Sequence, residues 1–160
     1  MNIFEFARVK EKQAEDIYQK LADTAFSEGI RSIFLKLAEA ENKHFSILLK
    51  MEEAEKVEVS NSDILYYAKE TLLKMKTREE KFKAATSQTQ IYQSALAQEA
   101  ESEKFYREHS EKASDSRQKN IFLILAQEEH HHYSTLENII DFLTFPATHP
   151  EDAEFRTPEE

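Results

Sequence analysis

One short stretch of this chain occurs twice, and the two copies lie 88 positions apart, as Glu129 does from Glu41. The first copy contains Glu41 and His44, and the second contains Glu129 and His132, so each carries the motif Glu-x-x-His. Residues three apart lie on one face of an α-helix. Each motif therefore directs a carboxylate and an imidazole the same way from one helix.

The repeat extends to the helix that precedes each motif. The same offset relates Glu99 to Glu11 and Tyr106 to Tyr18. An offset shared by two helices indicates a duplicated helical hairpin, and such repeats take precedence over single motifs. Two hairpins together supply four carboxylates and two imidazoles. This is the ligand set of a di-metal carboxylate site inside a four-helix bundle.

The composition supports an all-α fold, because the chain has one glycine and three prolines, all three of them near the C-terminus. We expect a ferritin-like four-helix bundle, whose two hairpins are joined by a long, partly helical crossover. Gly29 is expected just past the end of the first helix, in a left-handed conformation. Ser62 or Asp63 is expected to cap a short crossover helix. The expected ranges are helices over 2–27, 30–54, 89–112 and 116–145, a crossover over 55–88, a bundle domain over 1–145 and an acidic, irregular tail over 146–160.

The polar residues of the repeat fall on otherwise apolar helix stripes. Burying an unpaired carboxylate is costly, so such residues need a partner or lie on the surface after all. A single Glu-x-x-His in a helix rich in glutamate would indicate surface chemistry, but two copies in one register favour metal binding. We assign Glu41 and Glu129 as bridging ligands. We assign Glu11 and Glu99 as terminal ligands. His44 and His132 are assigned as one imidazole ligand for each metal.

The register of the second motif needs a test, because Glu128 and His131 also form Glu-x-x-His. The offset places them over Ala40 and Lys43, which cannot be equivalent ligands. We therefore expect Glu128 and His131, and with them His130, to face solvent or a neighbouring subunit.

Four further residues repeat with the same offset. Tyr18 and Tyr106 are either core aromatics or hydrogen-bond partners that orient a ligating carboxylate. Glu15 and Glu103 are reserve ligands, although such a pair more often lies on a solvated face.

Charge and cysteine content exclude several classes of function. The net charge of −10 argues against nucleic acid and anionic membranes as partners. The chain has no cysteine, which excludes disulfides, thiolate zinc sites and iron–sulfur or rubredoxin-type centres. No apolar run reaches membrane-spanning length and the N-terminus lacks the pattern of a signal peptide, so we expect a soluble, cytoplasmic protein.

These motifs resemble the rubrerythrin-like branch of the ferritin-like superfamily over about residues 4–143. The resemblance rests on Glu11-x6-Tyr18, Leu37-Ala-x-x-Glu41-x-x-His44, Glu99-x6-Tyr106 and Leu125-Ala-x-x-Glu129-x-x-His132. It implies a non-haem centre of two iron ions, for which manganese or zinc could substitute, and usually a homodimer. It also implies reduction of hydrogen peroxide, or reaction with oxygen.

Two departures from the prototype family pattern affect this expectation. Prototypes carry a cysteine-ligated rubredoxin domain, whereas this chain would need an external electron donor such as a separate rubredoxin or flavoprotein. Prototypes also have an additional glutamate where this chain has Ser102. The alternatives are a ferroxidase or iron-storage protein and a non-catalytic metal-binding bundle.

Overall fold

The computed structural model describes the whole chain except residues 26, 56–58, 60–61, 76–88 and 145–160. The described residues form helices and no strands. The helices are α1 (Ile3–Asp23), α2 (Glu28–Glu52), α3 (Ile64–Lys74), α5 (Thr89–Lys112) and α6 (Ser116–Thr144). No helix among these residues combines the length and apolarity that crossing a membrane requires.

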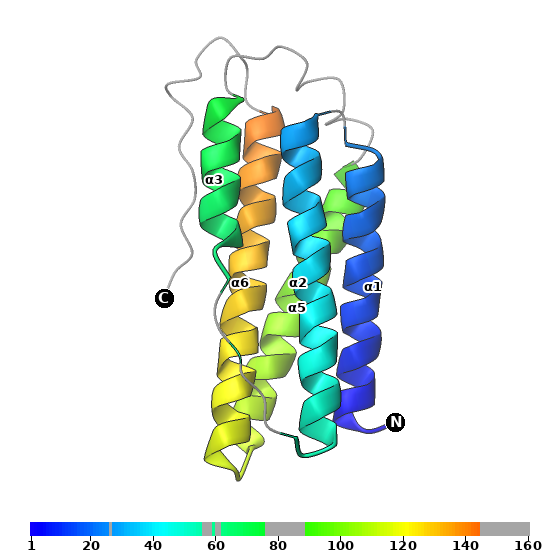
Figure 1. Cartoon of the computed structure of the whole chain (residues 1–160), viewed down its shortest axis with the longest axis vertical. Coiled ribbons are helices and arrows are strands. Elements are labelled where there is room, and N and C mark those ends of the chain that lie inside the picture. The colour runs from blue at the N-terminus through cyan, green and yellow to red at the C-terminus, as the bar shows by residue number, and fades with distance from the viewer. Residues whose placement is uncertain (26, 56–58, 60–61, 76–88, 145–160) are drawn as a thin grey trace.

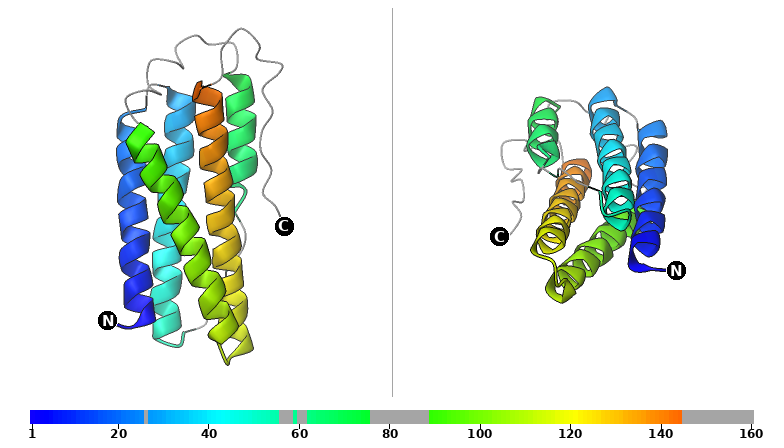
Figure 2. Two further views of the ribbon diagram at one scale, coloured as in Figure 1. Left: turned by 180° about the vertical axis from the view of Figure 1, so that it is seen from behind. Right: turned by 60° about the horizontal axis from the view of Figure 1, so that its bottom comes forward.

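The four long helices form a bundle of two antiparallel hairpins, α1–α2 and α5–α6 (Figure 1). Helices α2 and α5 run in the same direction, as expected when a long crossover joins the hairpins. The short helix α3 lies outside the four-helix core, alongside the second half of α6 (Figures 1 and 2). The all-α, ferritin-like fold is confirmed.

The turn between α1 and α2 differs from the expectation. Helix α1 ends at Asp23, and the hydroxyl of Ser27 accepts a hydrogen bond from the N–H of Ile30 and so caps α2. Gly29 therefore lies in the first turn of α2, and its φ is not positive. The prediction of a left-handed Gly29 was wrong. A side chain here would be crowded instead, because a Cβ on residue 29 would meet Sδ of Met75, just past the end of α3.

The start of α3 also differs in detail. Asp63 occupies the N-cap position but makes no side-chain capping hydrogen bond. Ser62 bonds to a residue of α6 instead, as described below. The expected break near residues 84–89 falls mostly outside the described residues, and so do Pro146 and the acidic tail.

The apolar core has two parts, one toward each end of the bundle. One part includes Tyr18, Leu37 and Leu136, and the other includes Ala7, Leu48 and Leu125. Burying each leucine contributes about 1.5–3 kcal/mol to folding. Along α1 and α2, the polar positions of the repeat fall between these two parts. The polar cluster is therefore closed off at both ends by packed side chains.

Candidate metal centre

The six residues assigned as ligands converge in the interior of the bundle. One comes from α1, two from α2, one from α5 and two from α6. None is more than 2% exposed, although all six side chains can carry charge. They are Glu11, Glu41, His44, Glu99, Glu129 and His132.

Within the cluster, each imidazole pairs with a carboxylate of the other hairpin. His44 Nδ1 lies 2.7 Å from Glu129 Oε1, and His132 Nδ1 lies 2.8 Å from Glu41 Oε1. The two rings stack with their centroids 5.7 Å apart. Residues three apart on one helix are less close, since His44 Nδ1 is 3.6 Å from Glu41 Oε2. The repeat therefore produces a centre that neither hairpin could form alone.

The two tyrosines are buried and also hold carboxylates of the cluster. The hydroxyl of Tyr18 donates to Glu99, and that of Tyr106 donates to Glu11. Each bond again crosses from one hairpin to the other. Burial, and then the negative charge of the bonded glutamate, raises the pKa of each tyrosine well above its ordinary value. The hydroxyls therefore remain protonated donors. Both tyrosines are core aromatics and also hydrogen-bond partners of a carboxylate, so the two alternatives left open by the sequence are compatible.

The ligand atoms form two overlapping groups, and in each group all of them lie within 4.8 Å of one another. Glu41 and Glu129 belong to both groups. Glu11 and His44 complete one group, while Glu99 completes the other together with His132. An arrangement with two shared carboxylates is suited to two cations that lie side by side.

Three carboxylate oxygens of the cluster are buried without any hydrogen-bond partner. They are the Oε2 atoms of Glu11, Glu41 and Glu99. Such atoms are rare because an unsatisfied buried acceptor costs about 1–3 kcal/mol. Carboxylate oxygens with imidazole nitrogens form a donor set that suits iron or manganese. The residues present therefore fit a pair of divalent metal ions.

Without metal, the raised pKa values of four side chains favour protonation within this cluster. Burial, and then the charge of neighbouring glutamates, raises the pKa of Glu41 and of Glu129 well above the ordinary carboxyl value. Burial alone would lower the pKa of His44, but nearby glutamates outweigh it and raise that pKa well above its usual range. The pKa of His132 is raised in the same way. Metal ions would replace these protons.

The structure contradicts the expectation for Glu128, which is 4% exposed rather than solvent-facing. Its Oε1 accepts the backbone N–H of Ser62 at 3.1 Å and its Oε2 accepts the Ser62 hydroxyl at 2.9 Å. The same Oε1 lies 4.0 Å from His44 Nε2. The repeat did not indicate this role, because the equivalent position is Ala40 and the crossover has no second copy.

The remaining polar residues of the repeat lie away from the cluster. Glu103 pairs with His130 and with Arg107, and Glu15 pairs with Lys12. His131 is half-buried rather than fully exposed. The structure places neither reserve glutamate among the six.

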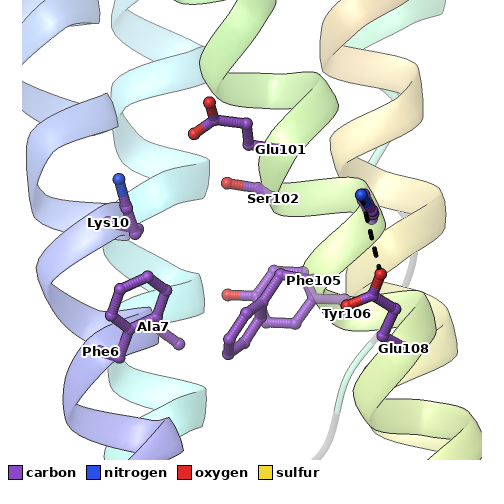
Figure 3. A pocket seen from close by; sticks show the side chains of 9 residues that line it. Phe6, Ala7, Lys10, Glu101, Ser102, Phe105, Tyr106 and Glu108 are labelled. Atoms are coloured by element: carbon purple, nitrogen blue, oxygen red, sulfur yellow. Dashed lines mark ion pairs between the residues drawn. The ribbon is translucent and has the colours of Figure 1, made fainter. Parts of the chain in front are cut away.

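A cavity of about 290 Å³ lies between α1 and α5 and reaches Tyr106 (Figure 3). Phe6 and Phe105 line it, with ring centroids 5.4 Å apart. Ser102, which is only half-buried, also borders this cavity and does not contribute to the cluster.

A sequence model of the rubrerythrin family matches residues 2–140. The chain belongs to the rubrerythrin family. Searches of curated proteins and of solved structures found no match. The family match covers all four long helices up to residue 140 and every residue of the cluster. A rubrerythrin domain and a buried carboxylate–histidine cluster able to hold metal therefore coincide in this chain.

Proposed function

We propose that this rubrerythrin-family chain is a di-iron oxidoreductase that reduces hydrogen peroxide with electrons from an external donor. The observation that carries the proposal is the pair of four-residue groups with two glutamates in common. Four carboxylates balance the charge of two divalent cations, which makes burial of the metal pair tolerable. Six protein side chains also leave room in the ligand shell for a small substrate.

Each residue has a distinct role in this proposal. Glu41 and Glu129 would be shared by the two metals, because each belongs to both groups. Glu11 and His44 would help to hold one metal. Glu99 and His132 would help to hold the other. When bound, a pair of ferrous ions supplies the two electrons that, with two protons, reduce hydrogen peroxide to water.

The surrounding residues keep the site in shape. The tyrosine hydroxyls orient Glu99 and Glu11, whose second oxygens stay free to bind metal. The two parts of the apolar core limit the access of water along the bundle axis. We propose that the electrons come from an external donor such as a separate rubredoxin or flavoprotein, because these 160 residues contain no cysteine to hold a rubredoxin-type centre.

We also propose that the chain forms a homodimer. Tyr66 on α3 is 69% exposed and Leu73 is 46% exposed. Burying these side chains against a second copy would remove apolar surface from water. Sedimentation velocity tests this separately, and a monomer at micromolar concentration would contradict it.

The experiment for the reaction is an anaerobic Fe(II) titration followed by one equivalent of hydrogen peroxide or oxygen. We expect two irons per chain and faster oxidation by peroxide than by oxygen. Faster oxidation by oxygen, with a large hollow particle in solution, would favour the ferroxidase and storage alternative. Two bound irons that react with neither oxidant would favour a non-catalytic metal-binding bundle. Failure to bind two metals would refute the proposal.

A further inference from the structure

A second and larger cavity approaches the cluster from the side opposite to the one in Figure 3. Its volume is about 900 Å³, and it lies between α2 and residues 62–64 at the start of α3. We name it the α2–α3 groove. Ala40, Lys43 and His44 line it on α2, and Ser62 and Ile64 line it on the other side. Its volume corresponds to many water molecules, each of which takes about 30 Å³ in the liquid.

This groove reaches a residue of the cluster directly. His44 belongs to the six and also lines the groove, although its side chain is only 3% exposed. The cavity between α1 and α5 reaches only Tyr106, which holds Glu11 (Figure 3). The α2–α3 groove is therefore the shorter approach, of these two, from solvent to a metal-binding side chain.

Glu128 also lines the groove, next to His44. Its carboxylate lies 4.0 Å from His44 Nε2 and accepts both hydrogen bonds from Ser62. Moving this side chain aside requires breaking those bonds to the crossover segment. Neither bond involves a residue of the cluster, so the closure can change without altering the ligand set.

We propose that the α2–α3 groove is the entrance through which small solutes, metal ions included, reach the site, and that Glu128 held by Ser62 closes it. This inference rests on the proposed function, since it assumes a metal site. The described part of the crossover, helix α3, packs against α6 and α2, so this entrance belongs to one side although the six candidate ligands form a symmetric set. Exchange would then depend on the crossover as well as on the ligands.

The test measures the rates of cobalt(II) loading and release in the full chain. Loading is followed by visible absorption after rapid mixing, and release is followed in excess chelator. Ser62→Ala removes one of the two bonds to Glu128 and should speed both rates about fivefold to tenfold. The equilibrium affinity should stay unchanged, because a lower barrier speeds both directions equally. Glu128→Ala should load at least as fast.

Two matched controls distinguish the proposed entrance from entry through the other cavity and from a general effect of substitutions near the groove. Ser102→Ala is the same substitution at the cavity between α1 and α5 and should leave both rates unchanged. Glu39→Ala removes an exposed carboxylate at the rim of the groove and should also have no effect. Melting temperatures of all variants verify that each one folds.

The outcomes are distinguishable. Unchanged rates of cobalt loading and release in Ser62→Ala would contradict the proposed entrance. Faster loading in Ser102→Ala would indicate that the cavity between α1 and α5 is the entrance. A weaker affinity with an unchanged loading rate would overturn the proposed entrance as well, since Glu128 would then only orient His44. Failure of the unmutated protein to bind two cobalt ions would refute the proposed function and the entrance together.

Discussion

Binding of two zinc ions at pH 6 should release more protons than a site with ordinary pKa values would, up to four per chain. The protein groups of the cluster hold these protons because burial and mutual repulsion raise the pKa values of Glu41 and Glu129. The neighbouring glutamates also raise the pKa values of His44 and His132 above 6.5. A carboxylate or imidazole must lose its proton to bind a metal. Two carboxyl groups and two imidazoles with raised pKa values therefore set the upper limit of four protons.

The expected number differs clearly from that of an unperturbed site. At pH 6, carboxyl groups and imidazoles with ordinary pKa values would together carry only about 1.6 protons. At the upper limit of four displaced protons, the overall affinity for the metal pair changes by about 5.4 kcal/mol for each pH unit. This dependence weakens at higher pH, once the groups lose their protons without metal.

Isothermal titration calorimetry measures the proton count. The zinc titration is repeated at pH 6 in buffers that differ in ionisation enthalpy, and the slope of the observed enthalpy gives the number of protons released. Zinc is chosen because it has no redox chemistry. Glu39→Gln, on the exposed face of α2, serves as the control and should release the same number. A release of about 1.6 protons or fewer would refute the argument that burial makes this cluster share protons.

Further predictions follow from individual contacts. Glu41→Ala removes a carboxylate common to both groups and should abolish binding of the metal pair, whereas Glu39→Ala should keep it; equal metal content by mass spectrometry would contradict the assignment. Tyr18→Phe leaves a buried carboxylate without its donor and should lower the free energy of unfolding of the metal-free protein by about 1–3 kcal/mol in urea titrations; an unchanged value would argue against that bond. Gly29→Ala forces a Cβ against Met75 and should lower the free energy of unfolding by about 1 kcal/mol. In a Met75→Ala background the same substitution should be neutral or stabilising, because alanine favours helix. An equal loss of stability in both backgrounds would exclude the steric cause. The metal-free protein should lose stability as the pH rises above the ordinary pKa values of 4.5 for the glutamates and 6.5 for the histidines, since the groups with raised pKa values keep protons in the folded state that the unfolded chain releases at lower pH. A melting temperature that rises with pH above these values would contradict this prediction.

Much of this fold was accessible from local patterns. Helical periodicity is a property of neighbouring residues, so the apolar stripes correctly indicated which side of each helix is buried. The observed bounds of α5 match the prediction, and α6 extends to the last described residue before the predicted end. The duplicated offset also separated Glu129 from the adjacent Glu128, although both precede a histidine by three positions. Helical periodicity and the repeat offset were therefore sufficient to predict the features that depend on position along a single helix.

The candidate site was predictable in its members but not in its contacts. The repeat indicated the six residues, all of which the structure brings together. It could not show that Tyr18 holds Glu99 rather than Glu11, because that choice depends on how α1 lies against α5. In the pair of Tyr18 and Glu99, as in the other tyrosine and histidine pairs of the cluster, the two hydrogen-bonded residues belong to different hairpins.

Position in the chain was misleading wherever a contact came from the crossover. Gly29 has the sequence appearance of a helix end, but it lies within α2, where Met75, just past the end of α3, would crowd a side chain. Glu128 has the appearance of a solvent-facing residue, and Ser62 turns it into a buried one. Periodicity and repetition thus establish which residues face inward, because both act along one helix. The packing of the helices and of the crossover decides which of those residues meet, because contacts such as those of Glu128 with Ser62 and of Gly29 with Met75 join segments that are distant in sequence.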